Sequence, residues 1–277
     1  MLDQPSPTPD PSSVGSALLR AMHVDSDPPP HIFVDELGLR LTAHERPVRL
    51  PPGMSEETAG RLRTSIVLRA RYIEDLVTEQ VQIGIRQYVI LGAGLDTFAQ
   101  RRAEVAERLT VFEVDRPGPQ AWKQQRLLEL GYGIPTWLRL VPFDFESNRF
   151  WKDALVNSGF EPDRPAVVSS SGVSMYLTRG AITESLRQCA TLVPGSVLVM
   201  SFGLSPDHTE PEDRPLQGGP DATFTCFSPS EVLELAREAG FRDVQHVSMA
   251  SLTERYLAGR SDHLQPSTAQ NLLLAMT

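Results

Sequence analysis

The chain is poor in lysine and cysteine. Its 277 residues include only two lysines, Lys123 and Lys152, and only two cysteines, Cys189 and Cys226. The formal net charge is −9 and no basic run is present, so we expect no binding to nucleic acid and no attraction to an anionic membrane. The cysteines are too few for a disulfide scaffold and lack the spacing of metal ligands. Because the six histidines are also scattered, no metal site is predicted.

Long apolar runs are missing as well. No stretch approaches the roughly 20 apolar residues that cross a bilayer, and the N-terminus has no apolar core of a signal peptide. With only two cysteines in the chain, these absences predict a cytoplasmic protein without a membrane segment.

The remaining composition is typical of a globular protein with a sizeable core, at 40% hydrophobic and 22% charged residues. Residues 1–13 carry four prolines and few apolar side chains, which predicts a disordered tail. Residues 14–60 have helical periodicity interrupted by prolines and predict an N-terminal helical cap. Residues 61–277 then form one large domain, which opens with an amphipathic helix over 61–85.

Within this domain, apolar strand patterns alternate with helical patterns, which predicts an α/β fold with a mostly parallel sheet and helices on both faces. The seven expected strands are 88–91, 111–114, 138–143, 166–169, 197–202, 244–249 and 272–276. A segment rich in Pro, Gly, Asp and Glu at 203–223 predicts a lid after the fifth strand. Ser228, Pro229 and Glu231 predict a capping box at the start of the next helix, and Gly240 its end.

The first expected strand ends in a glycine turn. Gly92 and Gly94 allow the backbone to turn tightly and to approach a ligand at the carboxyl edge of the sheet. An acidic pair, Glu113 and Asp115, follows about twenty residues later at the end of the second strand, where a carboxylate can bind ribose hydroxyls. The glycine turn alone could be purely structural, but with these acids it predicts a nucleoside-type cofactor.

The residues after the glycines distinguish between two cofactors. A dinucleotide site requires a further glycine so that the helix N-terminus can approach a pyrophosphate, and here Thr97 stands at that position. The preceding Asp96 would repel a pyrophosphate but suits a cofactor that carries an ammonium and a sulfonium. These residues favour S-adenosyl-L-methionine over a nicotinamide cofactor.

Several motifs are shared with a known family. They are RARYIED at 69–75, LGAGLDT at 91–97, FEVDRP at 112–117 with Lys123 beyond, VPFDF at 141–145 and SGVSMYL at 171–177. With them, residues 14–260 resemble the leucine carboxyl methyltransferase-like family of class I methyltransferases, including its bacterial members. The resemblance implies a Rossmann-like, seven-stranded sheet and S-adenosyl-L-methionine as cofactor.

The resemblance also implies roles for individual residues. Arg69 would bind the methionine carboxylate of the cofactor, although a solvated arginine on a helix face is the alternative. Gly92 and Gly94 would pass beneath the cofactor, and Asp115 would hold the ribose with Glu113 as a neighbour. The adenine contacts would come from the motif at 141–145, where Asp144 accepts from the amino group and the Phe145 backbone donates to the ring.

The motifs say less about the residues that would bind the methyl acceptor than about those that would bind the cofactor. Ser171, beside the cofactor, replaces a glutamate of the eukaryotic members, which leaves Tyr176 as the nearest polar candidate. The alternative for Tyr176 is an amphipathic wall residue. His208, in the expected lid, is the only histidine we consider as a base. We therefore expect an O-methyltransferase acting on a small-molecule or peptide carboxylate or phenol, in bacterial secondary metabolism. The alternatives are a nicotinamide-dependent oxidoreductase and a non-catalytic cofactor-binding protein.

Overall fold

The computed structural model describes residues 8–42, 54–147, 150–213 and 224–277. The N-terminal half contains α1 (Pro11–Ser26), α2 (Glu36–Thr42), α3 (Glu56–Gln82), β1 (Gln87–Leu91), α4 (Phe98–Arg101), α5 (Ala103–Ala106), β2 (Thr110–Asp115), α6 (Pro117–Glu129) and β3 (Leu138–Pro142). The C-terminal half contains α7 (Trp151–Asn157), β4 (Val167–Ser170), α8 (Arg179–Ala190), β5 (Val197–Leu204), β6 (Cys226–Phe227), α9 (Pro229–Ala239), β7 (Asp243–Val247), α10 (Met249–Leu257) and β8 (Gln270–Met276). Short 3-10 turns include η1 (Ser174–Tyr176) and η2 (Pro206–His208).

The strands form one sheet in the order β3-β2-β1-β4-β5-β8-β7. β8 is antiparallel to both of its neighbours, whereas the strands from β3 to β5 are parallel. The predicted α/β class and the seven predicted strands are confirmed. An additional strand, β6, pairs with the end of β5. It has only two residues, which is too short for a hydrophobic period to reveal it.

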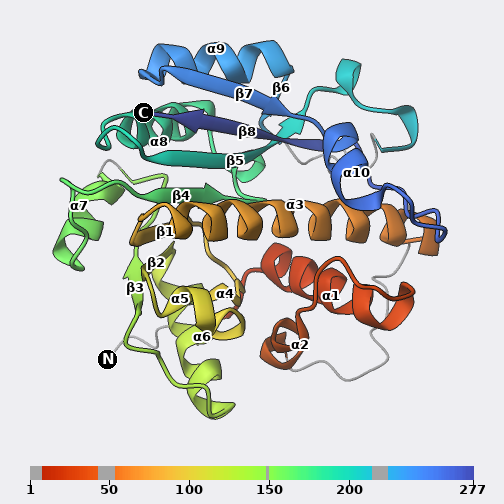
Figure 1. Ribbon diagram of the computed structural model, residues 1–277, viewed down its shortest axis with the longest axis horizontal. Helices are drawn as coiled ribbons and strands as arrows, with labels where there is room; N and C mark the ends of the chain where they lie inside the picture. The colour runs from red at the N-terminus through yellow and green to blue at the C-terminus, as the bar shows by residue number, and fades with distance from the viewer. Residues whose placement is uncertain (1–7, 43–53, 148–149, 214–223) are drawn as a thin grey trace, which may run out of the picture.

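Helices cover both faces of the sheet (Figure 1). One face packs against α7, α8 and α9, where Trp151, Ile182 and Val232 are almost fully buried. The other face packs against α3, α4, α5 and α10. Alternate residues of β1 divide between these two cores, with Val89 in the first and Ile90 in the second, as the two-residue period of a strand requires.

The N-terminal cap lies beside α3 (Figure 1). Of the expected tail, residues 1–7 lie outside the described part, while α1 begins at Pro11, before the expected boundary. Asp10 is its N-cap, and the Asp10 carboxylate accepts a hydrogen bond from the N–H of Ser12 at 2.9 Å. α3 likewise starts earlier than expected, because Ser55 caps it through the N–H of Thr58.

Two features near the C-terminus refine the sequence-based boundaries. The capping box of Ser228 and Glu231 is confirmed, and Gly240 ends α9 with φ of +114°. The strand expected over 244–249 is β7, which ends at Val247 because Ser248 caps α10, a helix that the sequence pattern did not predict. Within the described ranges, no helix is both long and apolar enough to cross a membrane.

The segment expected to form a lid is described only in part, because residues 214–223 lie outside the described ranges. From Gly203 the chain first continues β5 and then forms η2. Asp213 is fully buried, and its carboxylate accepts hydrogen bonds from Arg61 Nη2 at 2.8 Å and from the N–H of Thr268 at 2.6 Å. The Asp213 side chain thus connects this part of the segment to α3 and to the loop before β8.

Candidate active site

The glycine turn follows β1 at the carboxyl edge of the parallel strands. Gly92 and Gly94 have φ of +71° and +48°, values that favour glycine. A Cβ atom at Gly92 would overlap Cγ2 of Val173, and one at Gly94 would lie 2.8 Å from Cβ of Ser13. The two glycines are therefore required both by their backbone conformation and by the close approach of neighbouring segments.

Asp115, the last residue of β2, reaches across to this turn. Its carboxylate accepts hydrogen bonds from the N–H of Gly94 and, at 2.6 Å, from the N–H of Arg116. The Arg116 guanidinium forms an ion pair with Asp10 at the start of α1. The fold thus brings the expected ribose-binding acid and the glycine turn into direct contact, with the tip of α1 beside them.

Glu113, two residues earlier on the same strand, has a different environment. It is fully buried, and its Oε2 lies 2.5 Å from Nζ of Lys123 on α6. Burial raises the pKa of Glu113 to about 7, with Lys123 acting in the opposite direction. The expected acidic pair is therefore divided, because Asp115 contacts the glycine turn while Glu113 pairs with a helix inside the protein.

Asp96 is half-buried at the start of α4. Its Oδ1 accepts a hydrogen bond from the N–H of Phe98 at 2.8 Å, which satisfies one of the free amide groups at the helix N-terminus. Its charge also raises the pKa of the nearby Glu113. Asp96 thus orders the turn and adds negative potential behind the glycines.

Arg69 is buried on α3, with 5% of its surface exposed. Its Nε donates to the carbonyl of Ser65 at 3.3 Å and its Nη1 donates to Oε1 of Gln270. No carboxylate of the described residues lies within ion-pair distance of it. Burial lowers the pKa of Arg69 to about 10, so it remains charged at neutral pH. A buried cation without an anionic partner fits the carboxylate of an amino-acid moiety.

The adenine candidates follow β3 and β4. Asp144 is exposed, and its Oδ1 accepts from the N–H of Glu146 at 3.1 Å. Phe145 packs edge-to-face on Phe143, with ring centroids 5.5 Å apart. Phe145 and Val173 also line a small apolar cavity of about 20 Å³, whose other walls come largely from α8 and β5. Ser171 is exposed directly after β4. These residues surround the same edge of the sheet as the glycine turn.

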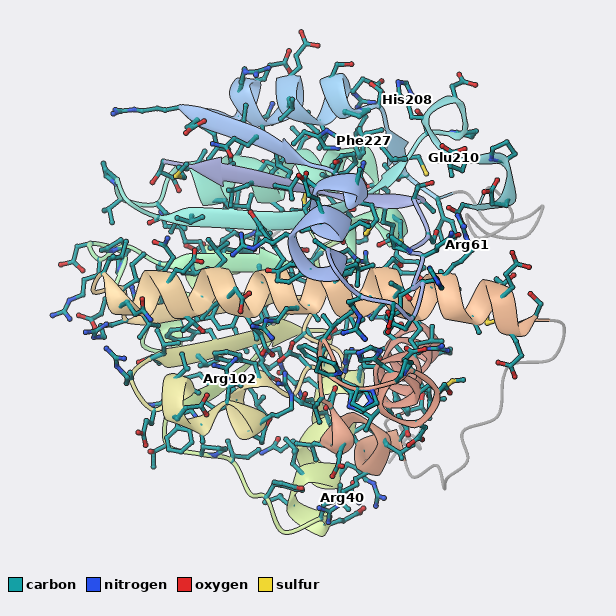
Figure 2. The ribbon with its side chains drawn as sticks, turned by 45° about the vertical axis from the view of Figure 1, so that its right-hand side comes forward. Arg40, Arg61, Arg102, His208, Glu210 and Phe227 are labelled. Atoms are coloured by element: carbon teal, nitrogen blue, oxygen red, sulfur yellow. The ribbon has the colours of Figure 1, made fainter. Side chains whose placement is uncertain are left out.

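The two candidates for the acceptor side lie in different surroundings. Tyr176 is 52% exposed, packs edge-to-face on Phe224 and is close enough to Arg69 to influence its pKa. His208 is exposed in η2, and its Nδ1 lies 3.0 Å from Oγ of Ser205. Figure 2 places His208 near one end of α9, on the outside of the molecule. None of the contacts described for His208 reaches Tyr176 or Arg69.

Three contributors to this site were not predicted from the sequence. Ser13 and Asp10 come from α1, within the segment expected to be disordered. Gln270 comes from β8 and contacts Arg69 across 201 residues of chain. A serine, an aspartate and a glutamine without a surrounding motif carry no local signal of a site.

The N-terminal cap is anchored to the glycine turn by a buried carboxylate. Asp35 is fully buried and accepts hydrogen bonds from Arg20 Nε at 2.7 Å and from Oγ1 of Thr97 at 2.9 Å. Arg20 also donates to the carbonyl of Leu95 at 2.8 Å. Neighbouring arginines and the N–H of Gly38 hold the pKa of Asp35 below its usual value, although burial acts in the opposite direction. The cap is therefore one wall of the site.

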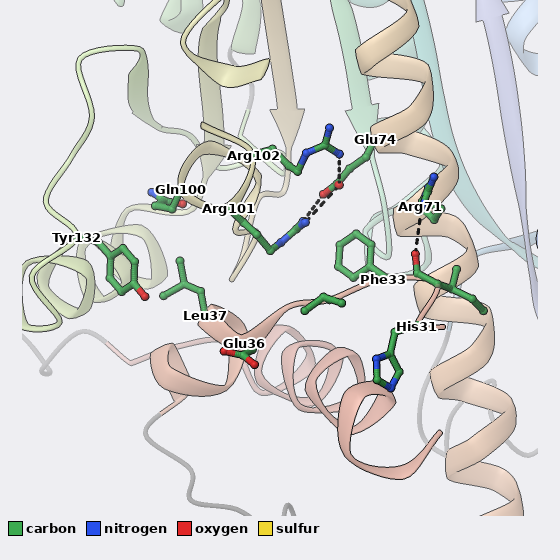
Figure 3. A pocket seen from close by; sticks show the side chains of 12 residues that line it. His31, Phe33, Glu36, Leu37, Arg71, Glu74, Gln100, Arg101, Arg102 and Tyr132 are labelled. Atoms are coloured by element: carbon green, nitrogen blue, oxygen red, sulfur yellow. Dashed lines mark hydrogen bonds and ion pairs between the residues drawn. The ribbon is translucent and has the colours of Figure 1, made fainter. Parts of the chain in front are cut away.

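A separate pocket of about 500 Å³ lies between the 31–37 segment, α3 and α4. Figure 3 shows Arg101 and Arg102 converging on Glu74, and Arg102 Nη1 lies 3.1 Å from Oε2 of Glu74. The Arg101 guanidinium also lies over the ring of Phe33 at 4.3 Å. None of the residues expected to contact the cofactor lines this pocket, although Arg101 connects its wall to Thr97 through a hydrogen bond of 3.3 Å.

Comparisons with known proteins identify the family to which the chain is similar. The family model of leucine carboxyl methyltransferases matches residues 13–190. A protein of Bacillus subtilis with the provisional name S-adenosyl-L-methionine-dependent methyltransferase YktD is 31% identical over 74% of this chain and 69% of its own.

Two solved structures share the fold. One is a protein of Thermobifida fusca provisionally described as a methyltransferase, with a TM-score of 0.61, 17% identity and coverage of 99% of this chain and 96% of its own. The other is the apo form of the S-adenosylmethionine-dependent methyltransferase SibL, with a TM-score of 0.51 and 17% identity over 82% of this chain. The present chain spans 59% of the SibL chain.

Proposed function

Because the chain belongs to the leucine carboxyl methyltransferase family, we propose that it methylates an oxygen of a small molecule or peptide that carries a carboxylate or a phenol. The family and the named relatives make the chain an S-adenosyl-L-methionine-dependent methyltransferase. They leave the nicotinamide-dependent and non-catalytic alternatives without support. The oxygen acceptor and its chemical class are the part that we add.

The residues around the glycine turn fit the cofactor. The buried guanidinium of Arg69, which has no carboxylate partner among the described residues, would bind the cofactor carboxylate, and Asp115 at the end of β2 would bind the ribose. Gly92 and Gly94 would lie beneath the cofactor, with Asp96 contributing negative potential for its cationic groups. Glu113 would affect the cofactor only indirectly, because its carboxylate lies in the interior and pairs with Lys123.

Adenine would lie at the neighbouring strand ends. Asp144 is exposed and can accept from the exocyclic amino group, while Phe145 can donate through its backbone N–H. Ser171, after β4, lies at the same edge and adds a small polar side chain. The ring of Phe145, which packs on Phe143 at this edge, would offer an apolar surface for the planar base.

The surroundings of Tyr176 carry the proposal for the acceptor. Its ring is half exposed, and two of its neighbours, Phe224 and Arg69, are an aromatic ring and a cation, neither of which can accept a proton. Bound S-adenosyl-L-methionine supplies an electrophilic methyl group on a sulfonium. An acceptor that is already ionised needs no general base, so this surface favours a carboxylate or a readily ionised phenol. Tyr176 would orient that oxygen, and the cap would exclude water.

The experiment uses methyl-tritiated S-adenosyl-L-methionine with panels of carboxylic acids, phenols, amines and peptides with a free C-terminal carboxylate. We expect label in the acid or phenol panel. Mild alkali then distinguishes the two, because a methyl ester releases volatile methanol whereas a methyl ether keeps its label. Label found only in amines would overturn the oxygen acceptor. Calorimetry that detects NAD binding but no response to S-adenosylhomocysteine would contradict the cofactor site.

A further inference from the structure

Gln270 is the first residue of β8 and stands opposite Gly203 of β5, at the carboxyl edge of the parallel strands. Its Oε1 accepts a hydrogen bond from Nη1 of Arg69. Its Nε2 lies 3.4 Å from Sδ of Met175 in η1, directly before Tyr176. The amide of Gln270 therefore connects the buried guanidinium to the turn that carries Tyr176.

Arg69 has an amide as its side-chain partner, whereas other buried arginines in the described part of the chain have carboxylates. Partly or fully buried guanidinium groups elsewhere pair with carboxylates, as in Arg20 with Asp35, Arg61 with Asp213, Arg63 with Asp27 and Arg101 with Glu74. Arg69 is more buried than any of these four arginines, yet its side-chain partner is neutral. Its positive charge consequently remains uncompensated by the described residues.

A neutral partner has a specific physical consequence. A carboxylate in place of the Gln270 amide would hold Arg69 equally well but would neutralise it, and the guanidinium would then gain less from a second anion. An amide oxygen accepts a hydrogen bond and fixes the direction of the guanidinium without adding charge. The Gln270 amide can therefore fix the orientation of the Arg69 guanidinium while the positive charge of Arg69 is kept.

We propose that Gln270 is a positioning residue that orients Arg69 while leaving its charge free for the carboxylate of the cofactor. The inference rests on the proposed function, because it takes Arg69 to be the carboxylate-binding residue. Recognition of the amino-acid end of the cofactor by Arg69 then depends on the neutral side chain of Gln270, which lies 201 positions further along the chain.

The test compares two ligands by calorimetry on the full chain. S-adenosylhomocysteine has the amino-acid carboxylate, whereas 5′-methylthioadenosine lacks the whole amino-acid group. For Gln270→Glu we expect the affinity for S-adenosylhomocysteine to fall roughly tenfold or more, because the new carboxylate pairs with Arg69. The affinity for methylthioadenosine should stay within about twofold of the parent, since it does not use Arg69.

Two further variants control for fold and charge. Gln270→Met keeps the length of the side chain without adding charge, and it should weaken S-adenosylhomocysteine less than Gln270→Glu does. Gln245→Glu places the same charge change on β7, where the side chain is exposed, and should leave both affinities unchanged. Equal losses for both ligands in Gln270→Glu, or no loss for either, would overturn the role of Gln270.

Arg69→Lys and Arg69→Met separate this inference from the proposed function. If these variants lose S-adenosylhomocysteine selectively while Gln270→Glu binds like the parent, Arg69 keeps its role and the inference about Gln270 fails. If the Arg69 variants bind both ligands like the parent, the assignment of Arg69 fails, and the inference about Gln270 fails with it.

Discussion

The carboxylate of Glu113 lies 2.5 Å from the ammonium of Lys123, and the side chains of both residues are 1% exposed. This buried pair joins β2 to α6 directly behind Asp115, the residue that contacts the glycine turn. The other carboxylate oxygen of Glu113 is buried without a hydrogen-bond partner among the described residues. The pair therefore holds β2 and α6 together next to the site. Its contribution to the free energy of unfolding can be measured without any substrate.

Removing the cation should destabilise the protein. Above pH 7, where Glu113 is ionised, Lys123→Ala leaves its carboxylate buried without a partner, and we expect the free energy of unfolding to fall by about 3–5 kcal/mol. Arg164→Ala removes an exposed pair with Glu161 and should cost less than about 1 kcal/mol. Urea denaturation at about pH 8 measures both values, and similar losses would contradict the distinction between a buried and an exposed pair.

The same pair predicts a pH dependence. The pKa of Glu113 is raised from its ordinary value of 4.5 to about 7. Between these values the folded state holds a proton that the unfolded state has lost, so the stability contributed by this group decreases as the pH rises through the window. The decrease should reach about 3 kcal/mol at most. Urea denaturation at pH 5 and pH 7.5 should reveal this fall in the parent but not in Glu113→Gln; the same slope in both would assign it to other groups.

Asp115 should matter for the cofactor more than for the fold. Asp115→Ala removes a carboxylate at the strand end, and we expect binding of S-adenosylhomocysteine to weaken by about 1–3 kcal/mol. The melting temperature should fall by only about a few degrees, because this half-buried side chain contributes little to core packing and its removal costs the hydrogen bonds from the N–H groups of Gly94 and Arg116. Calorimetry and thermal denaturation provide the two measurements. Normal binding in Asp115→Ala, combined with loss in Glu113→Gln, would transfer the ribose contact to Glu113.

The glycine turn offers a test of close approach. Gly84→Ala and Gly92→Ala both place a side chain at positive φ, which costs about 1 kcal/mol. At Gly84 the new Cβ has no neighbour within 4 Å, whereas at Gly92 it overlaps Val173. Gly92→Ala should therefore lose more stability and also weaken S-adenosylhomocysteine. Adding Val173→Ala should recover part of the stability loss, and no recovery in the double variant would argue against this contact.

Tyr176 and His208 can be separated kinetically once an acceptor is known. Tyr176→Phe removes the hydroxyl at the acceptor surface and should lower kcat/KM for the acceptor by roughly tenfold, while the affinity for S-adenosylhomocysteine is unchanged. His208→Ala should behave like the parent, because His208 contacts Ser205 on the outside of the molecule. A large loss in His208→Ala alone would restore it as the base.

Much of this architecture could be predicted from the sequence because it depends on local patterns. Alternating apolar runs predicted the seven main strands, and Ser228 with Glu231 predicted the start of α9. Gly92 and Gly94 predicted a tight turn because positive φ is a property of the residue itself. Such features depend on residues a few positions apart, so their chemistry is visible in the linear chain.

The tertiary structure decided which of these residues act together. Glu113 and Asp115 share one face of β2, so no pattern along the strand could separate them, and only the position of Lys123 on α6 assigns Glu113 to the interior. Gln270 meets Arg69, and Ser13 meets Gly94, because the packing of β8 and α1 brings distant segments to one edge of the sheet. Contacts of this kind depend on the whole set of packed elements. A single residue without a motif carries no trace of them.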